Sequence, residues 1–206
     1  MAEAKLETEV RREQIAEAAM NLIAGQGLRR MSIAAVARRV GIVPSGIYRH
    51  FKNKDEIIHA VLDRVGRRLS ENVEAACREC DDPLEQLKGV LMRHIRFIRE
   101  GRAVPRMVFA DDAQTDNSRL KQHAVKVFSG YIGQVAEIVG QGQSRGRIRL
   151  DIDPRTVAMM LLGIVVPAGI IWHLTDGGFD VTRHAQQSWR LFTAAVTNNA
   201  NHPDQQ

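Results

Sequence analysis

Apolar residues recur at helical spacing along almost the whole chain, and this pattern limits the fold more than any other feature. Between residues 8 and 24, for example, Ile15, Ala19 and Ile23 fall on one helical face. Residues that begin or end helices separate this segment from similar ones, as Gly41 does. No convincing strand, internal repeat or linker is recognisable. The sequence therefore predicts an all-helical protein.

Several helix starts can be placed from capping residues. Ser32 and Asn53 are good N-caps, and Glu56 follows Asn53 at the spacing of a capping box. Asp153 followed by Pro154 is typical of a helix start. We therefore predict helices over about residues 8–24, 33–40, 44–51, 54–80, 84–99, 117–141, 155–175 and 181–198, with a short helix near Met107.

Positive charge is concentrated in residues 18–54, which we call the basic segment. The chain of 206 residues has a net charge of +5, but the basic segment contains no Asp or Glu and the remainder is slightly acidic. Apolar residues at helical spacing interrupt the cations, so the segment folds. A folded basic module is typical of nucleic-acid binding, although a solvated positive face is an alternative. Its seven cations are Arg29, Arg30, Arg38, Arg39, Arg49, Lys52 and Lys54.

Residues 32–51, SIAAVARRVGIVPSGIYRHF, have the pattern of a helix-turn-helix. Two short helices are joined through Gly41, which supplies a turn conformation that other residues resist. Ala37 is small enough to let the helices cross closely, and Ile47 lies on the buried side of the second helix. The exposed face that remains has almost no apolar surface and consists of Ser45, Gly46, Tyr48, Arg49 and His50.

The stretch from about residue 12 to residue 62 resembles the DNA-binding domain of the TetR family of transcriptional regulators. The resemblance rests on Ile15, Ala18 and Ala19 and on the segment MSIAAVARRVGIVPSGIYRHFKNKDEIIHAVL. Within it, Tyr48-Arg49-His50-Phe51 followed by Lys54-Asp55-Glu56 is specific to this family among helix-turn-helix proteins. The resemblance implies a homodimer that places the second helix of the motif in the major groove of double-stranded DNA.

The resemblance also implies roles for individual residues. Ser45 and Gly46 would lie at the base-reading end, and Arg49 would contact a base or a phosphate. Phosphate contacts would come from Ser32, Tyr48, His50 and Lys54. The sequence departs from the family at Val43, which has no hydroxyl to cap the recognition helix. Gly46 offers no side chain to a base and costs up to ~1 kcal/mol of helix stability relative to Ala, so we expect few direct base contacts.

We divide the chain into residues 1–55, a three-helix helix-turn-helix domain, residues 56–200, a larger helical domain for effector binding and dimerisation, and a tail, 201–206. We expect an apolar effector cavity in the larger domain. Its candidate lining residues, each of which could instead be ordinary core, are Met92, Phe97, Phe109, Phe128, Tyr131 and Trp172.

Residues 156–175 contain no Asp, Glu, Lys or Arg and approach the length of a membrane span. We interpret this segment as a fully buried helix, because it also holds Gly163, Pro167 and His173. A helix that is apolar all round needs partners on all sides. We therefore expect it to pair with residues 181–198 and their two-fold mates in a four-helix bundle. A membrane-anchored regulator is the alternative.

Two other groups of residues can be explained by ordinary packing or by exposure to solvent. Cys77 and Cys80 could be a redox or metal pair, but nothing nearby completes a zinc site, so we expect ordinary packing. Arginines at 93, 96, 99, 102 and 106 form a solvated face or a mouth that attracts an anionic effector. No phosphate-binding glycine loop, nucleophile elbow or paired-carboxylate motif is found. We therefore expect no enzyme, no bound metal and no cofactor.

Together these features predict a ligand-responsive transcriptional regulator. We expect a repressor that binds a palindromic operator as a homodimer and is released by a small-molecule effector of unknown identity. The chain begins with a charged helical pattern, so we expect it in the cytoplasm and not in a membrane. A DNA-binding protein without any ligand is the alternative, and a dry, fully packed C-terminal core would favour it.

Overall fold

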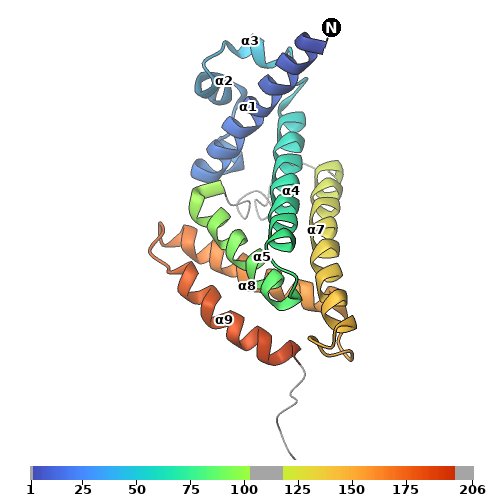
Figure 1. Ribbon diagram of the computed structural model, residues 1–206. Coiled ribbons are helices and arrows are strands. Elements are labelled where there is room, and N and C mark those ends of the chain that lie inside the picture. The colour runs from blue at the N-terminus through green and yellow to red at the C-terminus, as the bar shows by residue number, and fades with distance from the viewer. Residues whose placement is uncertain (1, 103–117, 198–206) are drawn as a thin grey trace, which may run out of the picture. The chain divides into compact units, whose positions relative to one another are not determined.

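A computed structural model describes residues 2–102 and 118–197, and every regular element in these ranges is helical (Figure 1). The all-helical prediction is therefore confirmed for the described residues, and the short helix predicted near Met107 lies outside them. The helices are α1 (Ala2–Gln26), η1 (Leu28–Arg30), α2 (Ile33–Val40), α3 (Pro44–Ile47), α4 (Lys54–Glu79), α5 (Pro83–Phe97), η2 (Ile98–Arg102), α7 (Ser118–Ser144), α8 (Pro154–Leu174) and α9 (Val181–Val196).

The helices begin where the capping residues predict. The side-chain oxygens of Ser32, Asn53 and Asp153 each accept a hydrogen bond from a backbone N–H three residues later, at 3.1, 2.9 and 2.7 Å. Asp82 caps α5 in the same way, through the N–H groups of the next turn. Each cap satisfies a donor that the helix itself leaves free, which contributes about 1 kcal/mol. Local sequence therefore sets these boundaries.

The chain forms two compact units. Unit 1 comprises residues 1–68 and 100–128, and unit 2 comprises residues 69–99 and 129–206. Both α4 and α7 contribute to each unit, whereas the sequence-based division had separated the domains at residue 55. In unit 1, α1 packs against η1 and α2, and α2 packs against α3. Its core is formed by residues with almost no exposed surface, including Ile15, Ala19, Met31, Val36, Ile47, Phe51, Ile57 and Val61.

The parts of α4 and α7 that belong to unit 1 meet closely. A Cβ atom added at Gly66 would lie 3.1 Å from a methyl of Val127, so the glycine permits this approach. Beside it, the Nδ1 atoms of His59 and His123 lie 2.5 Å apart, and Nε2 of His123 lies 2.7 Å from a carboxylate oxygen of Asp63. These contacts hold the N-terminal half of α7 against α4.

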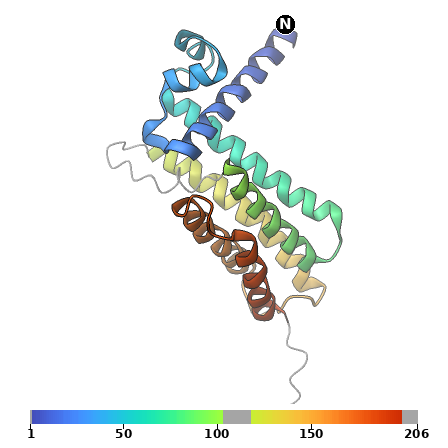
Figure 2. The ribbon, with the colours of Figure 1, turned by 90° about the vertical axis from the view of Figure 1, so that its left-hand side faces the viewer.

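In unit 2, α5 packs against α8 and α9, and these two helices pack against each other (Figures 1 and 2). The N-terminal part of α5 also lies against α4, where a Cβ added at Gly89 would be 3.2 Å from the Cβ of Ala76. The buried core of unit 2 includes Leu87, Val90, Leu91, Ile95, Val135, Val139, Leu161, Val165, Ala185 and Phe192.

The prediction that residues 156–175 form a fully buried helix is wrong for the single chain. One face of α8 is buried, but the other exposes a stripe formed by Met159, Met160, Ile170, Ile171 and Leu174. By length and composition α8 could cross a membrane, and 33% of its most apolar window is buried. The interpretation failed because one protomer offers neighbours to only one side of this helix.

Candidate functional site

The helix-turn-helix has the geometry that its glycine predicts. Gly41 ends α2 in the left-handed conformation, with φ of 80°, and its N–H donates to the carbonyl of Ala37. Val43 precedes α3 without a side-chain cap, as its lack of a hydroxyl predicts. Ile47 and Phe51 are almost completely buried and hold α3 and the turn after it against the core of unit 1. Between these anchors, Tyr48 and Arg49 are exposed and His50 is half-buried.

The proposed DNA-contacting residues lie at the surface of unit 1. Ser32, Ser45, Tyr48 and Arg49 are exposed, and Gly46, His50 and Lys54 are half-buried. Six of the seven cations of the basic segment are exposed, Lys54 being the exception. The positive side chains are exposed to solvent, and Ile47 is the only residue of α3 that is buried in the core. This face can therefore bind a polyanion without any loss of core contacts.

Lys54 and His50 have structural contacts that the sequence did not predict. The ammonium of Lys54 donates to the carbonyl of Leu28 at 3.3 Å, which ties the start of α4 to η1. Burial, followed by the charges of Arg11, Arg12 and Arg49, lowers the pKa of His50. In the free protein these surroundings therefore favour the neutral form of the His50 ring.

Arg12 is a residue of this site that sequence reasoning missed. Its guanidinium lies 4.1 Å from the centre of the Phe51 ring and donates a hydrogen bond to the carbonyl of His50. These contacts fix the segment after α3 to α1, so Arg12 positions the DNA-contacting face. No local signal marks it, because its hydrogen-bond partner is 38 residues away in the chain.

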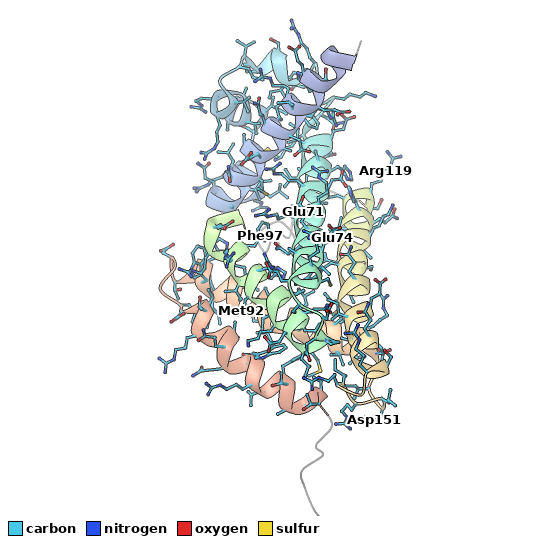
Figure 3. The ribbon with its side chains drawn as sticks, in the orientation of Figure 1. Glu71, Glu74, Met92, Phe97, Arg119 and Asp151 are labelled. Atoms are coloured by element: carbon cyan, nitrogen blue, oxygen red, sulfur yellow. The ribbon has the colours of Figure 1, made fainter. Side chains whose placement is uncertain are left out.

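The predicted effector-lining residues are divided between the two units. Four of the six lie in unit 2, where Phe97 and Tyr131 are buried and Met92 and Trp172 are half-buried. Met92 and Phe97 both come from α5 (Figure 3). Trp172 lies beside Gly177, at the turn between α8 and α9. Phe128 is half-buried and belongs to unit 1, and Phe109 lies outside the described residues.

A buried polar pair in unit 2 was also missed. Nδ1 of His94, on α5, lies 3.1 Å from the hydroxyl of Tyr131, on α7, and the two rings meet edge to face. Burial lowers the pKa of His94 to about 4 and raises that of the Tyr131 hydroxyl, so both groups are neutral at physiological pH. The sequence marks His94 only as one of several scattered histidines, since Tyr131 lies 37 residues away.

The arginine row that begins on α5 and continues into η2 is not uniform. Arg93 forms an ion pair with Glu79 of α4, which lowers the pKa of that carboxyl. Arg96 and Arg99 are exposed. The side chains at 102 and 106 lie outside what the structure describes. Among the described side chains of the row, Arg93 is therefore paired, and Arg96 and Arg99 are exposed cations of unit 2.

The surroundings of Cys77 and Cys80 do not favour redox or metal chemistry. Cys77 and Cys80 are free, half-buried thiols, and burial raises the pKa of Cys77, which disfavours the reactive thiolate. Among the described residues, no group of three or more His, Cys, Asp or Glu side chains could hold a metal ion.

Comparisons with known proteins agree with this architecture. The family model described as "Bacterial regulatory proteins, tetR family" matches residues 15–61, and that of "YsiA-like protein, C-terminal region" matches residues 62–195. The fatty acid metabolism regulator protein of Bacillus subtilis (strain 168) is 23% identical over 185 residues, 90% of this chain and 95% of the relative.

Two solved structures have the same fold. One is the transcriptional regulator FadR from Bacillus subtilis in complex with stearoyl-CoA, with 22% identity, a TM-score of 0.76 and coverage of 89% of this chain and 98% of the other. The second is AibR in complex with isovaleryl coenzyme A and operator DNA, with 21% identity, a TM-score of 0.67 and coverage of 88% and 97%. The chain therefore belongs to the TetR family of bacterial regulatory proteins and is a DNA-binding transcriptional regulator, not an enzyme.

Proposed function

We propose that this regulator is a cytoplasmic repressor that binds a two-fold symmetric operator and releases it when an acyl-coenzyme A thioester binds in unit 2. The observation that supports operator binding best is the exposed face around α3, where Tyr48 and Arg49 stand among the surface cations of the basic segment. The contacting residues in this proposal are Ser32, Ser45, Gly46, Tyr48, Arg49, His50 and Lys54.

A second copy of the chain is the proposed partner of α8. TetR-family regulators act as dimers, and the apolar stripe through Met160, Ile171 and Leu174 needs a cover. Leu191 of the neighbouring α9 is 75% exposed, and this apolar side chain also needs a partner surface to cover it. Pairing α8 and α9 with their two-fold mates would form a four-helix bundle. A membrane is a less suitable cover, because the opposite face of α8 is already buried within unit 2.

The effector proposal rests on the relatives and on the chemistry of unit 2. Two structures of the same fold hold acyl-coenzyme A molecules. Such a ligand combines an apolar chain with several phosphates. In unit 2, apolar side chains such as Met92 and Phe97 could line the space for the chain, and the exposed Arg96 and Arg99 could bind phosphates through charge-assisted hydrogen bonds. Tyr131 and Trp172 are the other candidate lining residues in unit 2.

Operator selection followed by effector titration tests this function. A duplex selected from a random pool should contain an inverted repeat. Its affinity, followed by fluorescence anisotropy, should fall with salt with a log–log slope of about −5 if about six phosphates are neutralised. Palmitoyl-CoA should release the duplex, and coenzyme A without an acyl chain should not. Selection of no duplex, or an affinity that does not depend on salt, would contradict the proposal.

A further inference from the structure

The His94–Tyr131 pair is an unusual feature of unit 2, because it places a half-buried and a buried polar group among apolar core residues. Its neighbours along α5, Leu91 and Ile95, are almost completely buried, and the ring of Phe97 lies 6.4 Å from that of His94. Buried polar groups are retained at a free-energy cost unless they find hydrogen-bond partners. The hydrogen bond between His94 and Tyr131 offsets part of this cost, and the rest depends on whether either ring keeps a donor without a partner.

The hydrogen-bond inventory of the pair leaves one donor unused. A neutral imidazole carries one N–H and a phenol carries one O–H, so the two rings together have two donors. Only one of them can lie in the 3.1 Å contact between Nδ1 of His94 and the Tyr131 hydroxyl. If the hydroxyl donates to Nδ1, the imidazole keeps its N–H at Nε2. If Nδ1 donates instead, the Tyr131 O–H is free.

The accessible surface of His94 indicates where that donor points. His94 is half-buried, but the residues three and four positions away on the same face of α5, Val90, Leu91 and Phe97, are almost completely buried. Because the accessible part of the ring lies in the middle of a buried helix face, it points into the interior of unit 2, and the free donor is available to a molecule there. Burial also lowers the pKa of the ring to about 4, which agrees with this placement.

We propose that the His94–Tyr131 pair sets effector specificity by donating one hydrogen bond to a neutral carbonyl oxygen of the effector and by rejecting an ionised carboxylate at that point. The proposal rests on the function proposed above, since it requires an effector within unit 2. A carboxylate that loses its water needs a cation in return, and this neutral pair does not supply one. An acyl thioester therefore fits, whereas the free fatty acid formed by its hydrolysis does not.

A pair of matched ligands isolates the hydrogen bond. Palmitoyl-CoA has a thioester carbonyl, and S-hexadecyl-CoA has the same number of chain carbons and the same coenzyme A group but no carbonyl oxygen. Affinities of the full-length dimer for both ligands and for palmitate are measured by calorimetry. Wild type should prefer the thioester to the thioether by about tenfold, as expected for one hydrogen bond in an apolar site.

Variants then assign this preference to the pair. In His94→Leu/Tyr131→Phe the two coenzyme A ligands should bind equally, and each single change should reduce the preference partially. Tyr131→Phe removes only a hydroxyl and serves as the test if the double variant does not fold. Ser70→Ala is the matched control, because it removes a 3.0 Å hydrogen bond from Ser70 to Gln134 of α7 elsewhere in unit 2. It should keep the wild-type preference.

The possible failures can be distinguished. If wild type binds neither coenzyme A ligand, the proposed function is wrong. If it binds both equally, or binds palmitate as tightly as palmitoyl-CoA, the effector proposal stands and the role of the pair is overturned. A tenfold preference that persists in the double variant would also overturn it, because another donor would then contact the carbonyl.

Discussion

The DNA-contacting face of unit 1 and the His94–Tyr131 pair of unit 2 are built in opposite ways. The first consists of exposed, mostly polar or basic residues that are close in sequence, with five of the seven between residues 45 and 50. The second consists of two neutral groups, the half-buried His94 and the buried Tyr131, that lie 37 residues apart. DNA is a polyanion that stays hydrated when bound, so its partner can keep its charges in water. A small molecule must be desolvated, so its partner needs neutral donors held by packing.

The largest expected effect comes from a charge on the stripe of α8. Ile171 is 41% exposed in the single chain, so Ile171→Asp should fold. In the proposed dimer, however, it buries an unpaired carboxylate, which costs about 3–5 kcal/mol and weakens the dimer at least a hundredfold. Sedimentation at micromolar concentration should show a monomer, and operator affinity should fall with it.

Val125→Asp is the control for this change. Val125 is 64% exposed on α7, away from α8 and α9 in the chain, so the variant should remain dimeric. A dimeric Ile171→Asp protein would place the interface elsewhere. A wild-type protein that stays with membranes after carbonate extraction would favour the lipid alternative for α8.

A second test uses acid to distinguish the buried histidine from the exposed groups. Because burial lowers the pKa of His94 from 6.5 to about 4, the unfolded chain binds more protons at this site than the folded one. The free energy of unfolding should therefore fall as the pH drops from about 6.5 towards 4, by up to about 1.4 kcal/mol per pH unit. Urea titrations of wild type and His94→Leu should diverge over this range, with the shallower dependence in the variant.

The comparison with His94→Leu subtracts every other titrating group, since those are common to both proteins. The absolute stability of the variant is not the readout, because Tyr131 loses its partner at every pH. Parallel pH curves for the two proteins would show that His94 is hydrated in the folded state and would contradict the placement of its ring in the interior of unit 2.

An intermediate effect is expected at Arg12. Arg12→Met should lower the free energy of unfolding by about 1–2 kcal/mol, since it removes a cation–π contact with Phe51 and a charged hydrogen bond to His50. Operator affinity should fall more than in Arg11→Met, which removes the same charge from α1 without these contacts. Equal losses in the two variants would mean that only the charge matters.

The smallest effect is expected at Gly46. An added Cβ would meet Ile42 at 3.5 Å, an ordinary contact, so the structure does not require glycine here. Gly46→Ala should therefore raise thermal stability, by at most about 1 kcal/mol, through better helix propensity. An unchanged operator preference in a binding selection would show that α3 reads few bases at this position, whereas lost binding would show that DNA approaches the backbone closely.

The sequence by itself determined the features that depend on neighbours a few residues apart. The caps at Ser32, Asn53 and Asp153, the left-handed turn at Gly41 and the burial of Ile47 all follow from short-range hydrogen bonds, backbone sterics and helical periodicity. The helix-turn-helix could therefore be located, and its exposed face described, from one stretch of chain.

Only the tertiary structure decided which long-range partners meet. Periodicity showed that α8 is apolar. It did not show that a single protomer covers only one face of this helix and leaves Ile171 exposed. It gave no indication that Arg12 contacts Phe51 or that His94 contacts Tyr131. These pairs are 37 or more residues apart, and their energies depend on burial and distance, which no local pattern encodes. The same arginine or histidine is a solvated side chain until the fold brings its partner to it.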